Sequence, residues 1–191
     1  MHPSRRSLLL ALAALPALAA CGRKRKLAAV PAGATVLALG DSITFGTGAT
    51  PETSYPSAIA RLTGWNVVNA GVPGDTSAGA LARLPALLQE HSPRLVLVGI
   101  GGNDFLRRLP LAETRANILA ICRQAVAAGT QVVLIAIPEA SAVAAAMRSL
   151  SDHAMYEEIA GEAKVPLYAA GWAKVLGDPT LRSDPIHAKA S

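Results

Sequence analysis

The stretch Val36–Gly48, VLALGDSITFGTG, decides how the chain begins its fold. Its first four residues are apolar, and Gly40 ends this run before Asp41 and Ser42 open a glycine-containing loop. A short apolar run bounded by glycine is typical of a strand that is buried on both faces. The stretch therefore predicts a buried strand that delivers a serine hydroxyl to the loop at its carboxyl end.

The rest of the chain alternates apolar runs with helical patterns. Further strands are predicted at residues 66–71, 94–102, 131–138 and 165–170, and helices at 54–64, 76–93, 113–129 and 151–164, the last capped by Ser151. Strands that alternate with helices predict an α/β fold with a parallel sheet, here as one domain over residues 35–191. The alanine-rich residues 139–150 fit either a loop or a mobile helix over the site.

The N-terminus predicts export and lipidation. A basic start precedes a 13-residue apolar run, Leu8–Ala20, which is too short to cross a bilayer comfortably. The residues LAAC, Leu18–Cys21, resemble a bacterial lipobox, so residues 1–20 are interpreted as a lipoprotein signal peptide and residues 21–34 as a lipidated basic tether. An ordinary cleaved leader with an incidental cysteine is the alternative, and Sec and twin-arginine export both stay open.

The positive charge lies in the leader and the tether. The whole chain has a formal net charge of +5, but from residue 27 onward 12 Lys and Arg face 13 Asp and Glu. Basic residues beside a lipid anchor favour anionic headgroups, whereas a nucleic-acid partner needs a basic face on the domain, which the sequence does not predict. With Cys21 lipidated, Cys122 is left as a buried structural thiol in a helix, and no Cys/His spacing indicates a metal.

Polar residues follow several of the predicted strands. The first strand ends in GDS, the second in NAGVPGDT and the third in GGND, and SDPIH, Ser183–His187, stands near the C-terminus. Ligands of parallel sheets gather at the carboxyl ends of the strands. The sequence therefore predicts a functional site at this edge of the sheet.

A serine hydroxyl becomes a strong nucleophile when a base takes its proton and a third group orients the base. His187 follows Asp184 by three residues, so a turn can set the carboxylate beside one ring nitrogen and leave the other for Ser42. A surface loop is the alternative for this pair. His91 is assigned to the end of a helix, and His153 to the exposed first turn of a helix.

Acyl transfer also requires donors for the oxyanion. Three candidates lie at the predicted edge, namely the backbone N–H groups of Ser42 and Gly71 and the side-chain amide of Asn103. Turn chemistry is the alternative explanation for Gly71 and Asn103, because both residue types favour turns.

The blocks GDSIT, NAGVPGDT, GGND and DPIH, in this order, resemble those of the SGNH/GDSL hydrolases from about Thr35 to His187. The segment from GDTSAGALARLP to GGND is similar to the bacterial multifunctional thioesterase/lysophospholipase/arylesterase branch. The resemblance implies a three-layer α/β/α flavodoxin-like fold with strand order 2-1-3-4-5. It also implies Ser42 as nucleophile, His187 as base paired with Asp184, and Gly71 and Asn103 completing the oxyanion hole, with no cofactor or metal.

By this resemblance together with the lipobox, the chain is expected to be a monomeric, membrane-anchored serine esterase that faces the periplasm or the cell exterior. It would hydrolyse carboxylic esters or thioesters of small molecules or lipids through an acyl-serine. The family usually adds a closing helix after the histidine, whereas this sequence ends in HAKAS with Lys189 at the usual asparagine position. That departure keeps open an inactive envelope lipoprotein, and a carbohydrate O-deacetylase using the same residues is a further alternative.

Overall fold

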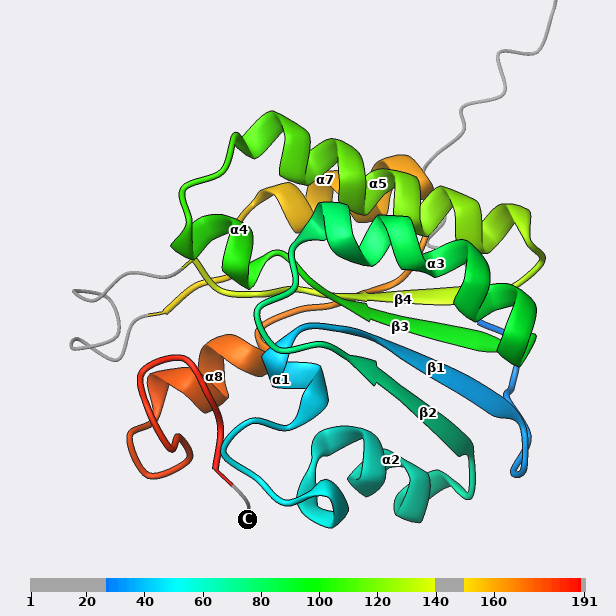
Figure 1. Cartoon of the computed structure of the whole chain (residues 1–191), viewed down its shortest axis with the longest axis horizontal. Coiled ribbons are helices and arrows are strands. Elements are labelled where there is room, and N and C mark those ends of the chain that lie inside the picture. The colour runs from blue at the N-terminus through cyan, green and yellow to red at the C-terminus, as the bar shows by residue number, and fades with distance from the viewer. Residues whose placement is uncertain (1–26, 140–149, 190–191) are drawn as a thin grey trace, which may run out of the picture.

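A computed structural model of the chain describes residues 27–139 and 150–189, and its centre is one parallel sheet. The five strands have the order β2-β1-β3-β4-β5, and all neighbours pair in parallel (Figure 1). The strands are β1 Thr35–Gly40, β2 Asn66–Gly71, β3 Leu95–Gly99, β4 Gln131–Ile135 and β5 Leu167–Tyr168. The predicted strand order and sheet type are confirmed.

Helices cover both faces of the sheet, as Figure 1 shows. One face carries α3 Ser77–His91, α5 Leu111–Ala127 and α7 Met155–Ala163, and the other carries α2 Tyr55–Thr63 and α8 Gly171–Gly177. Three further short helical segments are α1 Ser42–Phe45, η1 Pro51–Thr53 and α4 Gly102–Leu106. The result is the predicted three-layer α/β/α architecture.

The two faces of the sheet bury cores of different size. The larger core lies between the sheet and α3, α5 and α7, and it contains the fully buried Leu37, Leu39 and Tyr156. The smaller core on the opposite face is built around Val36 and Leu97. Alternate residues of β1 thus enter both cores, which explains why its sequence is an unbroken apolar run.

Among the described residues, the free cysteine Cys122 belongs to the larger core. Cys122 lies inside α5 and is completely buried, as the sequence predicted. Burial raises the pKa of its thiol to about 12, because a thiolate loses its hydration there. The side chain therefore acts as a small apolar residue of the core.

Some predicted boundaries differ from the observed ones. Helix α7 begins at Met155 after Ala154, so Ser151 does not cap it. The short helices α1 and α4 were not predicted, because four or five residues carry too little periodicity. Residues 140–149 of the alanine-rich segment, the leader and Cys21 lie outside the described residues, and the described stretch 178–189 contains no helix.

The last part of the predicted tether packs on the domain. The Ala28 backbone exchanges two hydrogen bonds with the Gln131 side chain, and Trp65 Nε1 donates to the Val30 carbonyl over 3.0 Å. Packing thus starts before the predicted boundary at Thr35.

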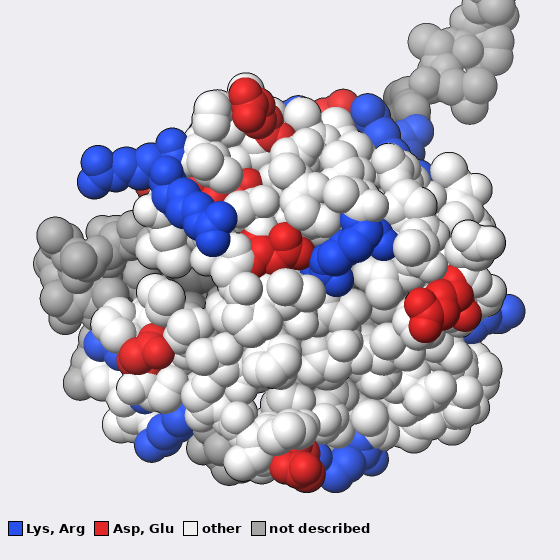
Figure 2. All heavy atoms as spheres, in the orientation of Figure 1, with Lys and Arg blue, Asp and Glu red and all other residues white. Residues whose placement is uncertain are grey.

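No helix among the described residues has the length and apolar character that crossing a bilayer requires. On the face in Figure 2, Lys and Arg alternate with Asp and Glu between wide uncharged areas.

Candidate active site

Ser42 stands where β1, an interior strand of the sheet, is followed by a helix. It is the first residue of α1, and Asp41 caps that helix by accepting the Ile43 N–H over 3.0 Å. A four-residue helix is unstable alone, so its position depends on packing against the sheet. The cap is almost completely buried, with Asp41 1% exposed. The serine is thereby fixed to the end of the strand.

Two glycines let α1 lie directly on the ends of two strands. A Cβ atom at Gly40 would overlap the Thr44 side chain, and one at Gly71 would overlap the Phe45 backbone nitrogen. Any larger residue at either position would push the helix away from the sheet. Both glycines therefore serve the placement of Ser42.

The structure brings Ser42, His187 and Asp184 into one chain of hydrogen bonds. His187 Nε2 lies 2.9 Å from Ser42 Oγ, and His187 Nδ1 lies 2.7 Å from Asp184 Oδ2. The other oxygen, Asp184 Oδ1, accepts the backbone N–H groups of Ile186 and His187 over 2.8 and 2.9 Å. This is the geometry in which a serine can give its proton to an oriented imidazole.

The two carboxylates near Ser42 have opposite electrostatic situations. Burial raises the pKa of Asp41 to about 6, against the lowering effects of the Ile43 N–H and the nearby His187. Partial burial also acts to raise the pKa of Asp184, but hydrogen bonds from the His187 ring and the Ile186 N–H hold it below its ordinary value. Asp184 is therefore the carboxylate suited to stabilise a protonated imidazole.

Two further histidines, His91 and His153, lie elsewhere among the described residues. His91 is the last residue of α3, as expected. His153 precedes α7, stacks on Phe105 with ring centroids 5.1 Å apart, and accepts the Met155 N–H with Nδ1. Neither is bonded to Ser42. The sequence prediction of His153 as an exposed residue in the first turn of a helix is wrong in detail, because the helix begins two residues later.

The predicted oxyanion donors are placed differently from one another. Asn103 lies in α4, donates with Nδ2 to the Asp75 carbonyl over 2.9 Å, and lines a cavity together with Ser42. An amide nitrogen carries two hydrogens, so one remains for a ligand. The Gly71 N–H instead donates to Asn69 Oδ1 over 3.0 Å. Gly71 is therefore a packing residue beneath α1, and its prediction as an oxyanion donor is corrected.

Sequence reasoning missed Gly74 in the same loop. Gly74 has a φ of +78°, a conformation that glycine adopts readily, and its carbonyl accepts Arg107 Nη2 over 2.7 Å. Among the hydrogen bonds of the described residues, none uses the Gly74 N–H. The loop lies beside Asn103 because the next residue, Asp75, accepts the Asn103 amide. The block NAGVPGDT contains two glycines, and the sequence alone did not distinguish their roles.

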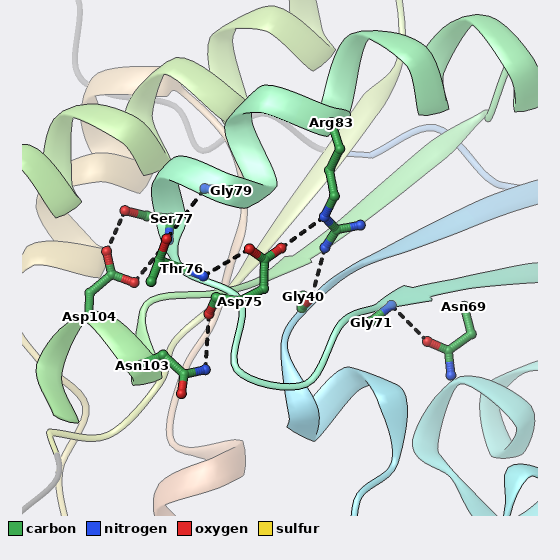
Figure 3. A network of polar contacts seen from close by, with 10 residues as sticks. All are labelled: Gly40, Asn69, Gly71, Asp75, Thr76, Ser77, Gly79, Arg83, Asn103 and Asp104. Atoms are coloured by element: carbon green, nitrogen blue, oxygen red, sulfur yellow. Dashed lines mark hydrogen bonds and ion pairs between the residues drawn. The ribbon is translucent and has the colours of Figure 1, made fainter. Parts of the chain in front are cut away.

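A buried polar network joins the loops around the site (Figure 3). Asp104, which is 2% exposed, accepts the Ser77 hydroxyl and backbone N–H over 2.5 and 2.9 Å and also accepts Thr114 Oγ1. It thereby ties α4 to the first turn of α3 and to α5. The carboxylate next to Asn103 thus holds the helix that presents Asn103.

A mostly apolar cavity of about 330 Å³ opens beside Ser42 and Asn103. Its apolar lining consists of Ile43, Leu106, Ile137, Pro138, Leu150, Leu176, Pro185 and Ile186. A pocket with many apolar residues and a few polar groups at one end suits an acyl or other apolar group that ends in a reactive carbonyl. Within residues 27–139 and 150–189, no group of three or more His, Cys, Asp or Glu is arranged to hold a metal ion.

The model of the GDSL-like lipase/acylhydrolase family matches residues 38–190. Esterase TesA of Pseudomonas aeruginosa is 40% identical over 108 residues, which cover 54% of this chain and 54% of that protein. The chain thus matches about half the length of that relative.

Two further relatives are matched over a larger share of their length. Thioesterase 1/protease 1/lysophospholipase L1 of Escherichia coli K12 is 35% identical over 158 residues, covering 80% of this chain and 74% of that protein. The crystal structure of the psychrotrophic esterase EstA from Pseudoalteromonas sp., inhibited by monoethylphosphonate, is similar with a TM-score of 0.69 at 27% identity. That match covers 81% of this chain and 87% of EstA.

Proposed function

The chain belongs to the GDSL-like lipase/acylhydrolase family, and from this premise we propose that it is a serine hydrolase that cleaves carboxylic esters or thioesters. The observation that carries the proposal is the continuous hydrogen-bond chain from Ser42 Oγ through His187 to Asp184, at 2.9 and 2.7 Å. A surface loop that only paired Asp184 with His187 would not require the hydrogen bond from His187 to Ser42. Its presence beside an apolar cavity favours catalysis over the inactive alternative.

The proposed reaction proceeds in two acyl-transfer steps. Ser42 Oγ attacks the carbonyl carbon while His187 Nε2 takes its proton, and a tetrahedral oxyanion forms. His187 then gives this proton to the leaving oxygen or sulfur, and the acyl group stays on Ser42. A water molecule, deprotonated by His187, attacks the acyl-serine and releases the carboxylic acid together with free Ser42. Asp184 keeps the ring oriented and stabilises its protonated form.

Three donors are proposed for the oxyanion. They are the Ser42 N–H, the free hydrogen of the Asn103 amide and the Gly74 N–H, which takes the role first predicted for Gly71. The proposal for Gly74 rests on its unpaired N–H among the described contacts and on the contact between Asn103 and the neighbouring Asp75. Such preorganised donors act where negative charge develops in the transition state.

The cavity supports an apolar acyl group as the part of the substrate that is buried. The relatives named above as esterase, thioesterase and lysophospholipase make carboxylic esters, thioesters and lysophospholipids the substrate classes to test. If the chain is exported, as its leader predicts, esters and lysophospholipids are the better candidates, because CoA thioesters are cytoplasmic.

The direct test is hydrolysis of p-nitrophenyl acetate by the full chain beside its Ser42→Ala variant. We expect turnover well above the uncatalysed rate for the wild type and background for the variant. Equal background rates for two folded proteins would favour the inactive alternative. A panel of acyl esters of increasing length would then define the acyl group that the cavity accepts.

Lipid anchoring is a separate part of the proposal. The lipobox-like residues Leu18–Cys21 support cleavage after residue 20, lipidation of Cys21 and attachment of residues 35–191 to a membrane by the basic tether 21–34. The protein would then face the periplasm or the cell exterior as a monomer. Wild type should sediment with membranes, and Cys21→Ser should be released or remain unprocessed. Soluble wild type whose processed N-terminus is another residue would contradict the anchor.

A further inference from the structure

Arg83 joins two loops of the site without lining the substrate cavity. Its Nε lies 2.8 Å from Asp75 Oδ2, and its Nη2 lies 2.9 Å from the Gly40 carbonyl oxygen (Figure 3). The two side chains of the ion pair are 24% and 12% exposed, so water screens them only in part. A planar guanidinium can hold two acceptors at fixed angles, which a single ammonium cannot.

Each end of this bridge leads to a reacting group. Gly40 directly precedes Asp41, the cap of α1, and Ser42 follows. The Asp75 backbone carbonyl is the acceptor that fixes the Asn103 amide at 2.9 Å. One arginine on α3 therefore contacts both the strand end that carries the nucleophile and the loop that orients an oxyanion donor.

We propose that Arg83 is a positioning residue that sets the separation between Ser42 and the Asn103 amide. This inference rests on the proposed function. Ser42 lies in α1 after β1 and Asn103 lies in α4 after β3, and a displacement of about 1 Å between them can cost on the order of 100-fold in rate. The bridge acts on the transition state more than on substrate binding, because Arg83 does not contact the cavity that holds the acyl group.

The experiment measures kcat and KM for a p-nitrophenyl ester with Arg83→Ala and Arg83→Met. We expect kcat to fall about 100-fold while KM changes less than about threefold. Guanidinium ion at concentrations below those that unfold the protein should restore part of the kcat of Arg83→Ala, and ammonium ion should restore less. This difference between cations reports the geometry of the bridge rather than general stability.

Arg115→Ala is the matched control. Arg115 lies on the neighbouring helix α5 and also makes two ion-pair contacts, with Glu158 at 3.3 Å and Glu162 at 2.7 Å, neither of which is a residue of the site. We expect Arg115→Ala to lose a little Tm, as the Arg83 variants should, but to lose no kcat. Folded Arg83→Met with wild-type kcat would overturn the inference, even if Arg83→Ala fails to fold. A wild type without hydrolase activity would overturn the proposed function as well.

Discussion

The proposed nucleophile, Ser42, and its proposed base, His187, are held by two different kinds of structure. Ser42 follows a central strand of the sheet, and its neighbour Asp41 is 1% exposed beneath it. His187 and Asp184 lie in the turn-rich stretch 178–189, where the Asp184 side chain is 45% exposed. The two halves of the site are 145 residues apart in sequence and meet through one hydrogen bond of 2.9 Å.

The difference lies in what fixes each half. The serine depends on long-range contacts, because glycines at two strand ends admit α1 and Arg83 ties the strand end to a second loop. The base depends on a local turn in which Asp184 Oδ1 accepts two backbone N–H groups. We therefore expect changes on the serine side to alter stability together with activity, and changes on the base side to alter activity alone.

The largest predicted effect comes from removing either end of the connecting hydrogen bond. Ser42→Ala and His187→Ala should each lower kcat by roughly 10⁴- to 10⁶-fold, and the double variant should lose little more, because the two residues act as one unit. Single-turnover rates with one ester measure this. Additive losses in the double variant would show that the halves work independently. An active His187→Ala beside an inactive His153→Ala would show that the assignment of the base to His187 is wrong.

Asn103→Ala tests the proposed oxyanion donor on the serine side. Loss of one oxyanion donor costs roughly 100- to 1000-fold in kcat, or about 2.7–4 kcal/mol, with little change in KM. The variant should also lose some stability, because Asn103 holds the Asp75 carbonyl. Values of kcat and KM are compared with those of Gly74→Ala. A change in KM alone would mean that Asn103 contacts the bound substrate rather than the oxyanion.

Asp41→Asn tests the cost of the buried carboxylate. The pKa of Asp41 is about 6 in the folded chain against an ordinary 3.8, so the folded state takes up a proton more readily than the unfolded chain. The penalty is full above pH 6 and disappears as the pH falls below about 4, and its upper limit is about 3 kcal/mol. Asparagine keeps an oxygen for the Ile43 N–H. Asp41→Asn should therefore unfold at a higher temperature than wild type at pH 8.

Thermal unfolding at pH 8 and pH 4.5 checks this prediction, with Asp184→Asn as the control. The rise in unfolding temperature of Asp41→Asn over wild type should be smaller at pH 4.5. Asp184→Asn should show no such rise, because Asp184 is exposed. An Asp41→Asn protein that is less stable than wild type at pH 8 would mean that the ionised carboxylate contributes more as a cap than its burial costs.

Asp184→Asn should have the smallest effect on activity. The ion pair with His187 is partly exposed, and exposed pairs contribute up to about 1 kcal/mol, equivalent to about a fivefold loss in kcat. Stability should stay close to that of wild type. The measurement is the kcat of Asp184→Asn against that of Asp184→Ala. A loss near 10⁴-fold would show that Asp184 fixes the histidine tautomer as strictly as a buried carboxylate does.

Much of the arrangement could be predicted from the sequence because its signals are local. The apolar run before Gly40 predicted a buried strand, and the three-residue spacing of Asp184 and His187 predicted a turn that pairs them. Both features depend on residues within one short segment. The alternation of strands and helices then placed the segments on a parallel sheet, and the structure has that sheet.

The rest depends on contacts between distant segments. The choice between Gly71 and Gly74 depends on which backbone N–H is already bonded, and the Asn69 side chain takes that of Gly71. Arg83 has the sequence appearance of an ordinary exposed helix residue, but its partners lie in two other loops. The pKa of Asp41 likewise reflects burial by the packed sheet and helices. Periodicity does not encode such relations.

Labelling with a fluorophosphonate tests the central claim most directly, because it requires an activated serine but no particular substrate. Intact-mass and peptide analysis of the folded wild type should find one adduct, on Ser42. Ser42→Ala should take up none, and His187→Ala should react far more slowly because its serine lacks a base. An unlabelled folded wild type, or an adduct on another residue, would contradict the account.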